Sequence, residues 1–111
     1  LRFNLSNYSN VIFFDEIDNG LSGKSLLAAI NLIKIISCSQ QTLCITHQPL
    51  LAASADIHFK VTKTVKGGLT STTMKKLISI KEKQTEIADL IGGGFKEASI
   101  YALTLINKAA A

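Results

Sequence analysis

Hydrophobic residues in the first part of the chain fall into two short continuous runs separated by a helical repeat. Residues 11–14, VIFF, form one such run, which is typical of a strand buried on both faces of a parallel sheet. After Ser22, a residue that suits an N-cap, apolar side chains recur every three or four positions and predict a helix over 26–36. Residues 42–46, TLCIT, predict a second buried strand. The order strand, helix, strand favours a right-handed parallel crossover.

The later part of the chain changes to an alternating pattern before it becomes helical again. Residues 50–55 have room for only a short helix. Apolar and polar residues then alternate over 58–77, with two glycines at 67–68, which predicts a β-hairpin whose turn needs positive backbone angles. Two terminal helices are expected at 82–90 and 96–107.

Length and composition limit the class of protein. The chain has 111 residues, about one domain, and its 47% hydrophobic and 18% charged content describes a folded protein with a core. It contains neither a membrane-length apolar run nor the pattern of a signal peptide, so the expected location is the cytosol. Cys38 and Cys44 are six residues apart, and Cys44 lies in an apolar string. A buried free thiol is therefore expected at Cys44 rather than a bridge or a metal ligand.

Lysines are concentrated around the predicted hairpin, although the net charge of the chain is only +4. Seven of them fall within 24 residues: Lys60, Lys63, Lys66, Lys75, Lys76, Lys81 and Lys83. One interpretation is a patch that faces a polyanion. The other is the solvated rim of a hairpin, which is favoured because no aromatic residues alternate with the lysines as a platform for bases would require.

Two glycine-containing stretches invite comparison with phosphate-binding loops. Such a loop reads Gly-x-x-x-x-Gly-Lys-Ser/Thr after a strand, because its glycines let consecutive amides point at the phosphates. Residues 23–25 read Gly-Lys-Ser, but Asp18 stands where the first glycine is needed, and its carboxylate is wrong both in size and in charge. The three glycines at 92–94 follow no buried strand and precede no Lys-Ser pair. Neither stretch is expected to bind phosphate.

A pair of carboxylates, Asp15 and Glu16, directly follows the first predicted strand. The carboxyl ends of parallel strands are where α/β sheets bind ligands, and a cation must offset carboxylate charge against a wall of low dielectric. In nucleotide hydrolases the first acid of such a pair lies near Mg²⁺, and the second orients or deprotonates water. The alternative is an acidic turn in which Asp15 only caps backbone amides.

His47 directly follows the second predicted strand and should emerge at the same edge of the sheet as the two acids. Its imidazole could hydrogen-bond a γ-phosphate or an attacking water, whereas a histidine taken alone is more often a structural residue. The acids and the histidine at adjacent strand ends support one another as a site for nucleotide chemistry.

Three strings carry a family resemblance: VIFFDEIDNGLSGK, LCITHQPLLAASADIHFKVTK and GGGFKEASIYALTLI. Together, over about residues 11–106, they resemble the carboxyl-terminal part of the RecN family, SMC-like ATPases with ABC-type heads. The resemblance implies an α/β fold in which residues 1–111 are the carboxyl-terminal portion of a P-loop NTPase head of the ABC type. Parallel strands with flanking helices, a β-hairpin and terminal helices are expected, while the Walker A loop and the signature motif are not in this sequence.

The resemblance also implies roles for individual residues. Asp15 would be the Walker B residue that serves Mg²⁺, Glu16 the catalytic base, and His47 the switch histidine near the γ-phosphate of ATP. Residues 18–23 resemble the D-loop, which lies across the interface between two heads. Its candidate nucleotide and interface residues are Asp18, Asn19, Gly20, Ser22 and Gly23. Many SMC-like heads end this loop in Leu-Asp, so the role of that aspartate does not transfer securely to Ser22.

Function and partners follow as expectations from the same resemblance. The chain would be a segment of a RecN-like ATPase that acts in DNA double-strand break repair and recombination, in the bacterial cytoplasm at the nucleoid. Its partners would be the remainder of the head with the Walker A loop, a second head through ATP-dependent dimerisation, and DNA, with no membrane. The isolated chain is not expected to hydrolyse ATP. The alternatives are a non-catalytic module that binds DNA or protein, and a head fragment of another SMC-like ATPase.

Overall fold

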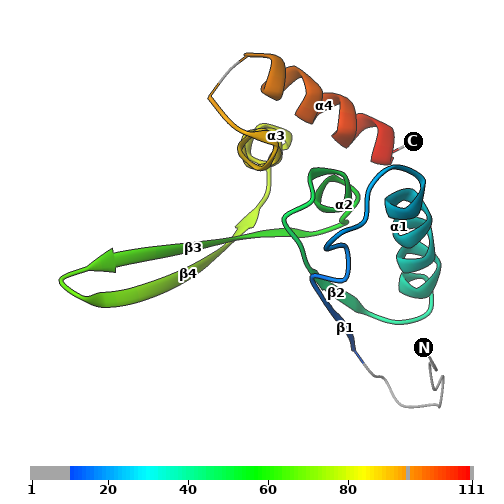
Figure 1. The fold of residues 1–111 in the computed structure, drawn as a ribbon, viewed down its shortest axis with the longest axis horizontal. Coiled ribbons are helices and arrows are strands. Elements are labelled where there is room, and N and C mark those ends of the chain that lie inside the picture. The colour runs from blue at the N-terminus through cyan, green and yellow to red at the C-terminus, as the bar shows by residue number, and fades with distance from the viewer. Residues whose placement is uncertain (1–10, 95, 111) are drawn as a thin grey trace. The chain divides into compact units, whose positions relative to one another are not determined.

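The computed structural model of the protein describes residues 11–94 and 96–110. Over these ranges it contains strands and helices in the order β1, α1, β2, α2, β3, β4, α3, α4 (Figure 1). The chain divides into two compact units, of which the first ends at Thr46 and the second begins at His47. The mixture of strands and helices confirms the expected α/β class.

The first unit is a strand–helix–strand segment. It consists of β1 (Ile12–Asp15), α1 (Gly23–Ser37) and β2 (Thr42–Ile45). β1 and β2 are parallel, with Ile12 opposite Thr42 and Asp15 opposite Ile45, as the sequence predicted. Because parallel strands need a crossover connection, α1 carries the chain back to the start of β2. Leu26, Ile30 and Ile33 form the buried stripe of α1, at the expected spacing of three and four residues.

The first strand was expected to be buried on both faces and the second to be buried, and both expectations are wrong. On β1, Phe14 is 7% exposed whereas its neighbour Phe13 is 62% exposed. On β2, Leu43, Cys44 and Ile45 are all exposed, so the predicted burial of Cys44 is wrong although its thiol is free as expected. The physical reason is that, within the described residues, this sheet has two strands and its unit has one helix, which can cover one face at most.

The second unit combines a long hairpin with three helices. After α2 (Pro49–Ala53), the strands β3 (His58–Lys66) and β4 (Leu69–Leu77) pair antiparallel. Gly67 and Gly68 make the turn with φ of 56° and 79°, the positive angles that the sequence predicted. The chain continues into α3 (Ile80–Ile91) and α4 (Lys96–Ala110), each longer than the predicted range.

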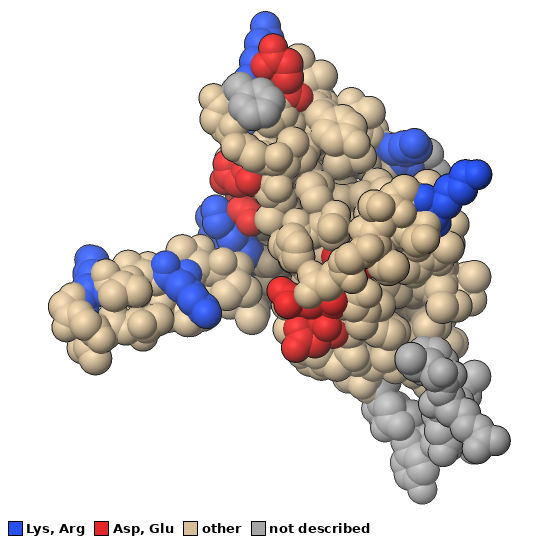
Figure 2. All heavy atoms as spheres, in the orientation of Figure 1, with Lys and Arg blue, Asp and Glu red and all other residues tan. Residues whose placement is uncertain are grey.

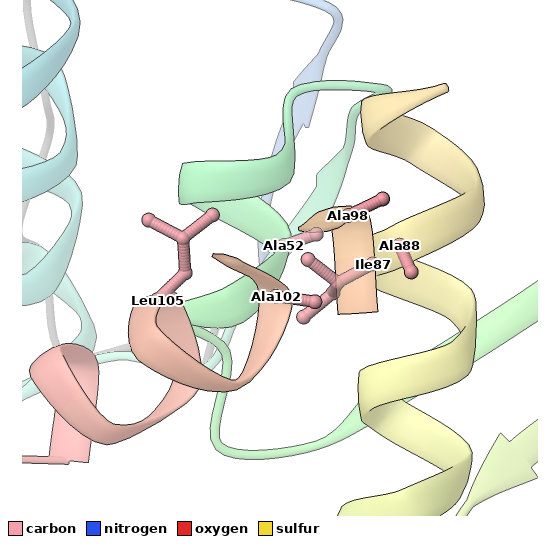
Figure 3. Close-up of a cluster of buried hydrophobic side chains, with 6 residues drawn as sticks. All are labelled: Ala52, Ile87, Ala88, Ala98, Ala102 and Leu105. Atoms are coloured by element: carbon pink, nitrogen blue, oxygen red, sulfur yellow. The ribbon is translucent and has the colours of Figure 1, made fainter. Parts of the chain in front are cut away.

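The core of the second unit lies where its three helices meet. Figure 3 shows its side chains converging from α2, α3 and α4: Ala52, Ile87, Ala88, Ala98, Ala102 and Leu105. Four of these six are alanines, which let the helix backbones approach closely around Ile87. A polar contact supports the packing of α3 on α4, because the side-chain amide of Gln84 donates to the carbonyl and the hydroxyl of Ser99, each at 2.9 Å.

Two ion pairs attach the base of the hairpin to α3. Nζ of Lys60 lies 2.9 Å from Oε2 of Glu86, and Nζ of Lys75 lies 3.3 Å from Oε2 of Glu82. Figure 2 shows further lysine side chains standing out along the hairpin. Two of the seven clustered lysines therefore have a structural partner on α3.

The helices that the structure describes include none with the length and hydropathy of a membrane span.

Candidate functional site

The two acids of the sequence motif lie at the carboxyl end of the parallel strand pair. Asp15 is the last residue of β1 and stands opposite Ile45, the last residue of β2. The ladder extends by one more bond, because the backbone N–H of Glu16 donates to the carbonyl of Ile45 at 2.9 Å. Both acidic residues are exposed. The structure thus presents two neighbouring carboxylates to solvent at the edge where parallel sheets bind ligands.

The described chain leaves Asp15 available for chemistry. Among residues 11–94 and 96–110, no amide or hydroxyl donates a hydrogen bond to its carboxylate. The alternative in which Asp15 caps backbone amides is therefore not what these residues show. Ser22 occupies the N-cap position of α1 instead, although its hydroxyl makes no capping hydrogen bond.

Glu16 has an unusual backbone. Its φ is +50°, and in the described part of the chain it is the one residue other than glycine with a positive φ. A non-glycine residue in such a conformation costs on the order of 1–3 kcal/mol, and it persists only where its surroundings fix it. Here the carbonyl of Glu16 accepts the N–H of Asn19 at 3.1 Å, and the side-chain amide of Asn19 lies 3.4 Å from Oε2 of Glu16. The turn after β1 therefore holds both the backbone and the carboxylate of Glu16.

Asp18 is placed very differently from the two acids before it. Its side chain is 1% exposed, and its Oδ2 accepts the hydroxyl hydrogen of Thr46, the residue that follows β2. Its Oδ1 is also buried and has no hydrogen-bond partner among the residues that the structure describes. Although Cys44 is exposed as a residue, partial burial of its thiol and then the negative charge of Asp18 raise the pKa of that thiol.

The remaining residues of the candidate D-loop are on the surface. Asn19, Gly20, Ser22 and Gly23 are all exposed, as contacts with a nucleotide or a second head require. The buried carboxylate of Asp18 faces inward instead. The assignment of this loop to a nucleotide or an interface stays a prediction.

His47 directly follows Thr46 and opens the second unit, and it is exposed. Its predicted role near a γ-phosphate stays a prediction.

Thr46 is the residue of this region that sequence reasoning missed. The sequence pattern predicts it only as the end of an apolar strand, yet its hydroxyl donates to Asp18, 28 positions away in the sequence. No spacing rule signals such a contact. The one hint was a hydroxyl residue that ends an otherwise apolar run.

The residues present fit a magnesium ion that is shared with a nucleotide. In the described part of the chain, no group of three His, Cys, Asp or Glu side chains is placed to hold a metal by itself. Mg²⁺ does not need such a group, because it is usually bound by one or two carboxylates together with substrate phosphates and water. The exposed carboxylate of Asp15 meets that requirement.

Curated relatives of this chain share one name. The chain is 40% identical over 118 residues to the DNA repair protein RecN of Synechocystis sp., an alignment that covers 93% of the chain and 20% of the relative. It is 45% identical to the DNA repair protein RecN of Bacillus subtilis over 82 residues, or 74% of the chain and 14% of the relative. It is also 40% identical to that of Halalkalibacterium halodurans, over 84% of the chain and 17% of the relative.

No protein-family model matches the chain. The chain spans about a fifth or less of the length of these curated relatives. The alignments nevertheless cover 93%, 74% and 84% of the chain itself. By sequence the chain belongs to the RecN family and corresponds to a carboxyl-terminal part of these proteins.

Proposed function

We propose that this chain is the segment of a RecN-type ATPase that supplies the magnesium-binding carboxylate and the catalytic base for ATP hydrolysis. The observation that carries the proposal is the pair Asp15 and Glu16, two consecutive exposed acids where two parallel strands end. Its relatives are named DNA repair proteins, and we propose the same process for this chain. More specifically, we propose that it acts in the repair of double-strand breaks at the bacterial nucleoid.

Each acid has a distinct part in the proposed reaction. The carboxylate of Asp15 would hold Mg²⁺, which when bound offsets the negative charge of the ATP phosphates. Glu16 would accept a proton from the water that attacks the γ-phosphate. Because Asn19 lies against Oε2 of Glu16, it orients that carboxylate before the substrate arrives. The family resemblance assigns contact with the γ-phosphate to His47, and we propose that role for it here.

Partners complete the proposed site. The 111 residues contain no Gly-x-x-x-x-Gly-Lys-Ser/Thr string, so the phosphate cradle is assigned to the remainder of the head. The exposed loop residues Asn19, Gly20, Ser22 and Gly23 would meet a second head. Phosphoryl transfer depends almost entirely on positioning and electrostatics, so the chain without its cradle should not hydrolyse ATP.

The test is reconstitution of the head. The chain is co-expressed with the Walker A portion of a RecN protein, and ATP hydrolysis is measured for the complex and for each part alone. Turnover by the complex alone supports the proposal. A complex that forms but does not hydrolyse ATP argues against it.

A second candidate function is DNA binding by the hairpin, favoured by the uneven pairing of its lysines. Lys60 and Lys75 pair with acids on α3, whereas Lys63, Lys66 and Lys76 are exposed and have no carboxylate partner among the described residues. Such cations can neutralise phosphates of a DNA backbone. If this is the function, DNA affinity falls with salt and survives Glu16→Gln, and replacing the three lysines by glutamine reduces the salt dependence. The same replacement at Lys108, near the end of α4, is the control.

A further inference from the structure

The carboxylate of Asp18 is the buried acid of the turn after β1. Asp15 and Glu16 in the same stretch are exposed, whereas the Asp18 side chain is 1% exposed. Removing a carboxylate from water is costly unless a hydrogen-bond donor or a cation compensates it. In the described chain that donor is the Thr46 hydroxyl. A turn that stays in water gains no stability from burying a carboxylate. The burial of Asp18 therefore indicates a structural role for its contact with Thr46.

Two hydrogen bonds attach the turn to the end of β2, one at Ile45 and one at Thr46, the next residue. The backbone N–H of Glu16 donates to the carbonyl of Ile45 at 2.9 Å, and the side chain of Asp18 binds the hydroxyl of Thr46. Within the turn, the N–H of Leu21 donates to the carbonyl of Asp18 at 3.0 Å. Asp18 therefore connects the inside of the turn to the strand end beside it.

These attachments explain how Glu16 keeps a positive φ. A strained residue relaxes unless the chain is fixed on both sides of it. The bond to Ile45 fixes the chain at Glu16, and the contact between Asp18 and Thr46 fixes it two residues later. If the second anchor is lost, Glu16 is free to return to an ordinary backbone conformation, which moves its carboxylate.

We propose that Asp18 is a positioning residue for Glu16, because its buried carboxylate, held by Thr46, locks the turn that keeps Glu16 in place. The proposal rests on the proposed function for the role of Glu16 as catalytic base, but not for the anchoring of the turn. Asp18 itself touches neither nucleotide nor metal in this account. Its carboxylate acts through the position of the backbone.

The test compares three variants in the complete head. Thr46→Val removes the hydroxyl at nearly constant shape and leaves Asp18 without a donor, Thr46→Ser keeps the hydroxyl, and Thr42→Val makes the same change at the other end of β2. Thr42 is a matched control, because it is also a partly buried threonine and its hydroxyl donates to the nearby carbonyl of Gln40. Two readouts are used: the steady-state constants kcat and KM for ATP, and the rate of amide hydrogen exchange at Asn19 and Leu21.

Thr46→Val should lower kcat about tenfold or more while KM changes less than about twofold, because the position of the base affects the transition state and not ATP binding. The Asn19 and Leu21 amides should exchange faster in the same variant. Thr46→Ser and Thr42→Val should match the wild type in both readouts. Unchanged kcat and exchange in Thr46→Val would overturn the proposal, and so would equal losses in Thr42→Val.

Asp18→Asn covers the case in which Thr46→Val fails to fold. Its amide oxygen can still accept the Thr46 hydroxyl, so a positioning residue should keep turnover within about threefold of the wild type. A loss as large as that of Glu16→Gln would mean that the charge of Asp18 acts directly, which overturns the proposal.

The exchange measurement distinguishes a failure of the proposed function from a failure of the anchoring by Thr46. If the wild-type head hydrolyses no ATP, the proposed function fails, while exchange at Asn19 and Leu21 still reports whether Thr46 anchors the turn.

Discussion

Nζ of Lys60 lies 2.9 Å from Oε2 of Glu86, so an ion pair joins the hairpin strand β3 to helix α3 within the second unit. The hydrogen bond that the Lys60 ammonium donates to Glu86, and then the negative charge of Glu86, raise the pKa of Lys60. The negative charge of Glu86 also acts on the imidazole of His58, the first residue of β3. The hairpin base is thus a place where the stability of the unit depends on charge.

The stability of the second unit should depend on pH through His58. Burial lowers the pKa of His58, the charge of Glu86 opposes this effect, and Lys83 adds to it. In the unfolded chain the imidazole has its ordinary pKa of about 6.5, so between the lowered value and about 6.5 the unfolded state binds more protons. The contribution is therefore present above about pH 6.5 and is lost as the pH falls through that window.

The measurement is the free energy of unfolding from urea titrations at pH 7.5 and at pH 5, for the wild type and for His58→Gln. The wild type should lose more stability on acidification than the variant does. Carboxylates that titrate are common to both proteins, so the difference between them isolates His58. Equal losses in the two proteins would show that His58 makes no such contribution.

Ile87 should be the most sensitive position of the helical core. It is 1% exposed at the meeting point of α2, α3 and α4, so Ile87→Ala should reduce the free energy of unfolding by about 2–5 kcal/mol. Ile80 on the same helix is 60% exposed, so Ile80→Ala should change the free energy of unfolding by less than about 0.5 kcal/mol. Both are measured by urea unfolding followed by circular dichroism. Similar costs at the two positions would contradict this core.

The two N-cap serines should contribute different amounts to the stability of the protein. The hydroxyl of Ser79 accepts the N–H of Glu82 at 3.1 Å at the start of α3, whereas Ser22 at the start of α1 makes no such bond. Ser79→Ala should therefore cost about 1 kcal/mol of stability, and Ser22→Ala only a few tenths. Thermal unfolding of the two variants makes the comparison. A larger loss for Ser22→Ala would speak against the cap assignment.

The hairpin turn should accept asparagine but not valine at Gly67. Its φ of 56° is strained for a β-branched residue by about 1–2 kcal/mol, while asparagine tolerates this region. Amide exchange at Lys66 and Leu69, the hydrogen-bonding pair of residues that flanks the turn, reports hairpin opening. Exchange should be faster in Gly67→Val and nearly unchanged in Gly67→Asn. The same rate in both variants would mean that the turn does not limit opening.

Local patterns predicted the elements of this chain well, because they depend on local chemistry. The spacing of Leu26, Ile30 and Ile33 indicated α1, and the glycine pair at 67–68 indicated the hairpin. Helix ends were less accurate, since α3 begins at Ile80 after a serine cap that was not recognised, and α4 extends to Ala110 through good helix formers.

Burial and long-range contacts could not be predicted in the same way. An apolar run such as TLCI shows that a strand can be covered, but not that covering elements are present, and Leu43 and Ile45 are exposed. The position of Asp15 and Glu16 followed from the end of the strand. The positive φ of Glu16 and the contact between Asp18 and Thr46 did not follow from the sequence. Asp18 and Thr46 are 28 positions apart and meet only in the fold.

We propose above all that Glu16 is the catalytic base of an ATPase. This proposal is tested by ATP turnover of the complete head with wild-type chain, with Glu16→Gln, and with Glu97→Gln, a matched change at an exposed glutamate in the first turn of α4. Loss of a general base should lower kcat about a hundredfold or more in Glu16→Gln, and Glu97→Gln should retain the wild-type rate. Turnover by Glu16→Gln at the wild-type rate would contradict the account.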